Sequence, residues 1–266
     1  LVMRLVEQDL VDLGTALVSY LPDYRQDTGS RITVHHLLSH TSGLTHYPSA
    51  APGFMLDAAR RPHDRREFAR VYCSGDLASE PGERFGYSND NYHLLGLVVE
   101  AVTGGTYEDA LARRVLAPAG MTAAGFVRHE TIVPQLASGY EWADDHYTNA
   151  PFVEMSVPWA AGGLIGTVGD LFRLHRALDS GRLLRPASLD RMFSPQATRD
   201  AQPVGYGCIL SRFEGHEVIV VPGSLPGLDN MLWFHRPSAS FMALLSNVWG
   251  RRPTGVPGAI LKRLIG

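Results

Sequence analysis

Lysine is almost missing from this chain of 266 residues, because Lys262 is the only one. A mechanism in which a lysine acts as the base for a nearby serine therefore has no candidate lysine among residues 1–261. Cysteine is scarce as well, and the separation of Cys73 and Cys208 fits neither a metal motif nor a disulfide framework, so we expect two buried thiols. No run of about 18 apolar residues is present, and we predict no transmembrane segment.

Concentrated positive charge is also missing. The formal net charge is −3, and the arginines occur singly or in pairs, without the basic stripe that follows a phosphate backbone. Nucleic acid is therefore not an expected partner. With 45% hydrophobic and 19% charged residues, the composition is that of an ordinary globular protein.

Motifs for a cofactor or a metal ion are absent too. The glycine pairs at 104–105 and 162–163 are not followed by Lys-Ser or Lys-Thr, so they indicate turns and not phosphate loops. His36 and His40 share a helix face, but no glutamate lies between them as in a metalloprotease helix. We expect no cofactor and no metal site.

The chain divides into a mostly helical part and a part with short strands. Helix N-caps are predicted at Thr33, Thr106 and Thr167, and the apolar residues between 94 and 102 form one face of another helix. Short β-type runs separated by glycine or proline predict antiparallel pairing at 206–213, 217–221, 230–235 and 240–247. We also expect a surface loop over 45–63 and a closing helix over 258–265.

A polar pair precedes one of these helices. Tyr87 and Asn89 are separated by one residue just before the helix, which places both side chains on the same side of its first turn. A tyrosine can transfer a proton when nearby cations lower its pKa, and an asparagine can hold a substrate carbonyl or amide. Residues of these types are also ordinary caps, so the pair alone does not identify a site.

Six motifs in a fixed order resemble the serine β-lactamase and penicillin-binding-protein superfamily, in particular its class C-like branch of β-lactamases, esterases and D-amino peptidases. The resemblance covers nearly the whole chain. The motifs are Tyr20-Leu21-Pro22, the run 32–44 (ITVHHLLSHTSGL), Phe85-Gly86-Tyr87-Ser88-Asn89, Pro118-Ala119-Gly120-Met121, Ala161-Gly162-Gly163-Leu164 and Gly223-Ser224-Leu225-Pro226-Gly227.

The resemblance implies roles for some of these residues. Tyr87 corresponds to the family's general-base tyrosine and Asn89 to its substrate-contacting asparagine. In the strand motif, Val221 replaces the family's lysine or histidine, while Gly223 and the N–H of Ser224 could still form half of an oxyanion hole. His216 lies five residues earlier and is expected to face elsewhere. Without cations beside it, the Tyr87 phenol should stay protonated near neutral pH.

The family's nucleophile motif, Ser-x-x-Lys, is absent from this chain. Residues 1–8 resemble the later turns of the helix that the nucleophile opens, so we expect the chain to be N-terminally truncated. The resemblance implies an α+β fold of the β-lactamase/transpeptidase type: an antiparallel sheet flanked by helices plus a mainly helical lobe, lacking the N-terminal strands. We expect one domain, 1–266, with a helical lobe at about 12–165 and a sheet-containing lobe at about 166–266 together with 1–11.

The leading functional hypothesis is a serine hydrolase that acts through an acyl-enzyme on an ester, an amide or a β-lactam, with a small-molecule or peptide substrate. This chain alone is predicted to be inactive. The alternative is a non-catalytic binding or regulatory protein with the same fold, and an unstable gene fragment is a third reading. Nothing in the sequence indicates the compartment or the oligomeric state.

Overall fold

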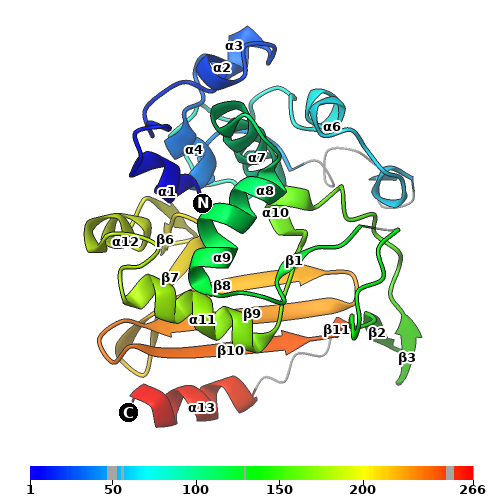
Figure 1. Cartoon of the computed structure of the whole chain (residues 1–266), viewed down its shortest axis with the longest axis vertical. Helices are drawn as coiled ribbons and strands as arrows, with labels where there is room; N and C mark the ends of the chain where they lie inside the picture. Colours follow the sequence, from blue (N-terminus) through cyan, green and yellow to red (C-terminus); the bar gives the residue numbers. More distant parts are fainter. Residues whose placement is uncertain (47–52, 55–56, 129, 250–254, 266) are drawn as a thin grey trace.

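A computed structural model describes residues 1–46, 53–54, 57–128, 130–249 and 255–265. In Figure 1 a helical layer lies above an antiparallel sheet, and a C-terminal helix lies below it. The predicted α+β class is confirmed.

The helices of the first part are α1 (Val2–Val6), α2 (Leu17–Tyr20), α3 (Gln26–Gly29), α4 (Val34–Leu38), η2 (Ala58–Arg60), α6 (Arg65–Tyr72), α7 (Asn89–Thr103), α8 (Tyr107–Leu111), the π-helical turn η3 (Ala112–Leu116) and α9 (Ala117–Ala119).

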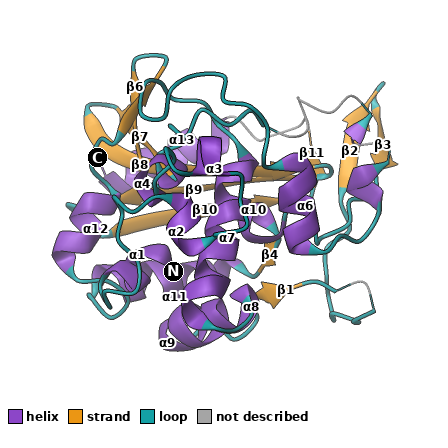
Figure 2. Ribbon diagram, turned by 90° about the horizontal axis from the view of Figure 1, so that it is seen from above, coloured by secondary structure: helices purple, strands orange, loops and turns teal. Residues whose placement is uncertain are grey.

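The main sheet has six strands in the order β10-β9-β8-β7-β6-β5, and every neighbouring pair is antiparallel. The strands are β5 (Ala197–Arg199), β6 (Gln202–Gly205), β7 (Cys208–Phe213), β8 (His216–Leu225), β9 (Leu228–His235) and β10 (Ser240–Ser246). Helix α11 (Val168–Asp179) contacts β10 from one side and α13 (Gly255–Ile265) from the other, so both faces of the sheet are covered (Figure 2). Helix α12 (Pro186–Met192) precedes β5.

Helix α7 is the centre of the helical layer. Ser88 caps it by accepting a hydrogen bond from the N–H of Asp90, and its apolar residues from Leu94 to Val99 are buried. Helix α10 (Trp159–Gly162) packs against it where Gly96 has no side chain, since a Cβ there would lie 2.6 Å from the Cβ of Ala160. This close approach fixes α7, whose first turn carries the predicted polar pair.

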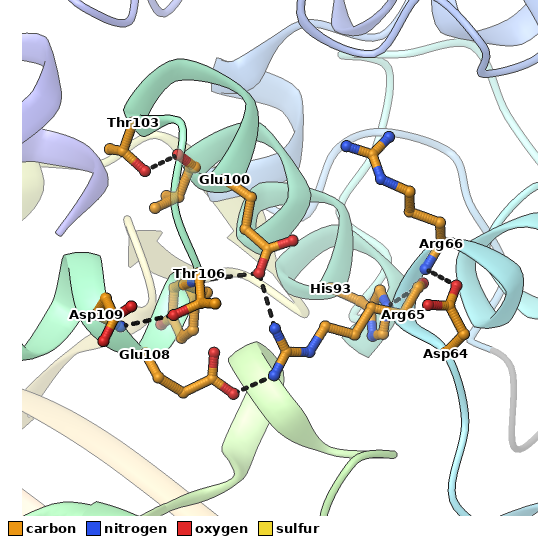
Figure 3. A network of polar contacts seen from close by, with 11 residues as sticks. Asp64, Arg65, Arg66, His93, Glu100, Thr103, Thr106, Glu108 and Asp109 are labelled. Carbon is orange, nitrogen blue, oxygen red and sulfur yellow. Dashed lines mark hydrogen bonds and ion pairs between the residues drawn. The ribbon is translucent and has the colours of Figure 1, made fainter.

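A partly buried ionic cluster of Arg65, Glu100 and Glu108 connects α6 to α7 and α8 (Figure 3). Arg65 Nη1 lies 2.8 Å from Glu100 Oε1, and its other terminal nitrogen pairs with Glu108. Only 27% of the Arg65 side chain is exposed, and its guanidinium carbon lies 4.7 Å from the centre of the Trp159 ring. Glu100 also accepts a hydrogen bond from the N–H of Tyr107, so one cation and two carboxylates connect three helices.

Several elements differ from the sequence-based expectations. Short strands that the sequence analysis does not predict form two small sheets. One consists of β1 (Gly125–Phe126) paired with β4 (Leu164–Ile165), and the other has the order β11-β2-β3, built from β2 (Tyr140–Ala143), β3 (His146–Asn149) and β11 (Val248–Trp249). Within the loop expected over 45–63, residues 47–52 and 55–56 lie outside the described residues. Among the described helices, none is both long enough and apolar enough to cross a bilayer.

Candidate active site

Tyr87 and Asn89 meet at the first turn of α7. The Tyr87 hydroxyl donates a hydrogen bond of 2.8 Å to Asn89 Oδ1, so the sequence spacing does bring the two side chains together. The backbone N–H of Asn89 points to His46 Nδ1 at 3.3 Å. Tyr87 remains open to solvent, with 55% of its surface exposed, and its phenol is therefore accessible to a ligand.

His40 supports this turn through hydrogen bonds and a ring contact. Its Nδ1 accepts hydrogen bonds from the N–H of Ser88 at 3.3 Å and from the amide of Asn91 at 3.1 Å, and its carbonyl accepts one from Gly86. Its ring also lies 4.7 Å from the Tyr87 ring, measured between centroids. The sequence analysis considered His40 only as a possible metal ligand and missed this link, which joins residues 48 and 51 positions apart.

His40 adopts an unusual backbone conformation for a residue with a side chain, with φ at +56° just after α4. Left-handed backbone is uncommon outside glycine and is often maintained at functional sites by surrounding contacts. Those contacts include a buried continuation of the network, because Asn91 Oδ1 accepts a hydrogen bond from Ser42 at 2.5 Å. The strained residue is therefore fixed on both its backbone and its side chain.

The electrostatics of the site favour neutral groups. Burial lowers the pKa of His40 to about 4, and His46 adds to that shift, so the imidazole is neutral with its proton on Nε2. Loss of water on one side raises the pKa of the Tyr87 phenol above its usual value. Tyr87 is therefore a hydrogen-bond donor near neutral pH.

We predict that acid destabilises the fold through its buried histidines. Burial also lowers the pKa of His93 to about 4, against about 6.5 in the unfolded chain. Groups with a lowered folded-state pKa stabilise the fold fully above about pH 6.5 and lose that contribution as the pH falls towards 4. Urea unfolding at pH 7 and pH 5 should show a loss of about 2 kcal/mol for each of His40 and His93. An unfolding free energy that is unchanged or larger at pH 5 would contradict this.

Gly223 and Ser224 lie on the part of β8 that extends beyond β7. The pairing of β7 with β8 ends at Val220 opposite Ile209, and among the described strands none pairs with 221–225 on that side. On the other side, Pro222 is opposite Met231 of β9. Because proline has no N–H, this cannot be a pair that exchanges two hydrogen bonds. By alternation, the N–H of Ser224 also points away from β9, toward the open edge, whereas that of Gly223 points to β9.

Two further expectations from the sequence concern Val221 and His216, which both lie on β8. Val221, which replaces the family's lysine or histidine, is half-buried and packs in an apolar cluster that includes Ile219 and Phe234. Strand β8 is continuous, which puts His216 on the opposite face from Val221 and at the far end of the strand, where it pairs with Phe213.

The structure thus contains two candidate half-sites. Tyr87 and Asn89 form one, and the open edge of β8 with Gly223 and Ser224 forms the other. Within the described residues, no hydrogen bond, ion pair or ring contact links one half to the other, and their functional roles stay predictions. A tyrosine, an asparagine and an unpaired strand N–H are suited to binding and polarising a carbonyl group. Attack on that carbonyl would also require a nucleophile, which this set of residues does not include.

Comparisons with known proteins show the family of the chain and agree with its fold. Residues 1–266 match the model of the Beta-lactamase family. The chain is similar to the D-aminopeptidase of Brucella anthropi (27% identical, covering 85% of this chain and 43% of the relative) and to the esterase EstB of Burkholderia gladioli (28% identical, 77% and 59%). It therefore spans about half the length of these curated relatives. It is also similar to the crystal structure of a penicillin-binding protein from Bacillus halodurans, with a TM-score of 0.83, 26% identity and coverage of 98% of this chain and 80% of that one.

Proposed function

Because this chain belongs to the Beta-lactamase family, we propose that its site serves acyl transfer in a serine hydrolase, with an ester or an amide as substrate. The observation that carries the proposal is the Tyr87–Asn89 hydrogen bond, held against the neutral, buried His40. Tyr87 is proposed as the proton-transfer group and Asn89 as the contact to the substrate. Ser224 is proposed to donate its N–H to the developing oxyanion, with Gly223 beside it.

The chemistry requires two groups that these residues do not include. A serine must attack the carbonyl carbon, and a cation must lower the Tyr87 pKa before the phenol can accept the serine proton. Ser-x-x-Lys would supply both at once. The proposal therefore concerns a polypeptide that contains such a motif in addition to these residues, and the chain as printed should not form an acyl-enzyme.

The substrate class follows from the relatives' names and from Val221. A D-aminopeptidase and an esterase are both similar to this chain, so amides and esters are the proposed substrates. A β-lactam carries a carboxylate, and the half-buried Val221 places an apolar side chain where the family has a cation. We therefore rank β-lactams below esters and amides.

The test is the intact mass of the protein after reaction with a fluorophosphonate probe or with p-nitrophenyl butyrate. We expect no covalent adduct on residues 1–266 alone. We expect one adduct, on the serine of Ser-x-x-Lys, on the protein isolated from its native source. The hydrolase proposal fails if the native protein contains no Ser-x-x-Lys, or contains it and reacts with neither reagent.

A second candidate function is a non-catalytic binding or regulatory protein with the same fold. It is favoured by the absence of Ser-x-x-Lys from residues 1–266 and by the apolar Val221, because a binding protein needs neither a nucleophile nor a cation beside Tyr87. Saturable binding of an ester or amide by a native protein that forms no adduct would support this candidate instead.

A further inference from the structure

A polar cleft adjoins Tyr87 on the side of the β5–β6 hairpin. Its volume is about 620 Å³, which is within the usual range for a ligand site. Tyr87 ends one wall, formed by residues 82–87, and residues 196–200 line another, with His35 and Thr41 completing the lining. Each of the two walls is a consecutive run of residues.

Strand β5 contributes an unpaired edge to this cleft. It is the last strand of the sheet, and among the described strands it pairs only with β6. Thr198 lies opposite Pro203, and because proline has no N–H, the two residues cannot exchange hydrogen bonds. The N–H and C=O of Thr198 are therefore directed away from β6. Thr198 is exposed and lines the cleft, so these groups are available to a ligand.

The opposite wall offers main chain as well. The N–H groups of Gly86 and Ser88 both point to His40, one to its carbonyl and one to its Nδ1. No hydrogen bond from the Tyr87 N–H is formed within the described residues. Main-chain groups without partners thus border the cleft on two sides.

The charges of the cleft are balanced. Glu83 and Asp200 are matched by Arg84 and Arg199, and all four residues are exposed. A ligand recognised mainly by its own carboxylate or ammonium would find no net charge of opposite sign here. A ligand with repeated N–H and C=O groups would instead match the two backbone walls.

We propose that this cleft binds an extended peptide of about three to four residues, which pairs with β5 as an additional strand. The acyl or leaving-group end of the peptide then lies next to Tyr87. The inference rests on the proposed function in one respect, because it names a peptide as the amide substrate. It is separate from the open edge of β8, since the hydrogen-bonding groups belong to Thr198 and Tyr87.

The test measures peptide binding by fluorescence anisotropy with fluorescein-labelled tetra-alanine amide and two analogues, each N-methylated at one internal residue. Binding to the native-sequence chain should be saturable and about tenfold weaker for the analogue whose methylated N–H would donate to the Thr198 C=O. The other analogue should stay within about twofold, because its N–H faces the Tyr87 N–H, which is a donor and accepts no hydrogen bond. Thr198→Pro removes the N–H that faces the cleft and should also weaken binding about tenfold, whereas Thr198→Val keeps it and should stay within about twofold.

Proline is tolerated on edge strands, so Thr198→Pro should fold, and circular dichroism checks this. If it does not fold, the N-methylated analogues on the unmodified chain decide. The inference is overturned if the peptide shows no saturable binding or if both N-methylated analogues bind as tightly as the peptide itself. A native protein that forms no acyl adduct but still prefers the unmethylated peptide would defeat the proposed function and leave this inference standing.

Discussion

Replacing Arg65 by alanine should lower the free energy of unfolding by about 2–4 kcal/mol, because it leaves two partly buried carboxylates without their cation. The side chains of Glu100 and Glu108 are only 15% and 18% exposed, and one oxygen of Glu108 already has no hydrogen-bond partner among the described residues. Removing the guanidinium also removes its contact with the Trp159 ring. Single domains are stable by roughly 5–15 kcal/mol, so the variant should be close to unfolding.

Arg70→Ala is the matched control, since it removes an arginine from the same helix. Arg70 pairs with Glu67 in an exposed ion pair, with 71% and 54% of the side chains accessible. Exposed pairs contribute about 0–1 kcal/mol, and this variant should unfold close to the wild type. Urea denaturation of both variants measures the difference. Equal losses of unfolding free energy in the two variants would show that the ionic cluster of Arg65, Glu100 and Glu108 does not stabilise the packing of α6 on α7 and α8.

The local features of the fold were predictable from the sequence because they depend on neighbouring residues. Thr33 and Thr167 were predicted as helix caps, and each accepts a hydrogen bond from the third residue of its helix. The β5–β6 hairpin was not predicted, since its turn is Asp200-Ala201, both with positive φ, and lacks the glycine that usually indicates such a turn. A turn without glycine gives too little local signal.

The candidate site was predictable only in part, for a related reason. The spacing of Tyr87 and Asn89 places them on one turn, whatever the rest of the chain does. The support from His40 and Asn91 depends on a contact between segments 51 positions apart, which no local pattern encodes. Pro222 and Pro203 become informative only when their strand partners are known, because a missing N–H then fixes which neighbouring groups face outward. The sequence suggested the candidate side chains, and only the tertiary structure placed the candidate main-chain donors.

The largest effect on activity should come from Tyr87→Phe, made in a polypeptide that also contains Ser-x-x-Lys. Loss of a positioned proton-transfer group typically lowers the rate by about 10²–10⁴, and we expect kcat/KM for p-nitrophenyl butyrate to fall by that factor. The fold should be retained, because the ring contact with His40 does not involve the hydroxyl and the residue is 55% exposed.

Tyr147→Phe provides the matched control for that experiment. Tyr147 is a tyrosine of similar exposure, 56%, on β3, where its ring contacts Trp142 and takes no part in the proposed site. Its loss of a hydroxyl should leave both kcat/KM and stability unchanged. The phenol of Tyr87 must lose its proton to act as a base, and its partial desolvation raises its pKa and opposes that loss. Activity should therefore depend on the lysine of Ser-x-x-Lys as strongly as on Tyr87, and a fully active Tyr87→Phe variant would assign proton transfer to another group.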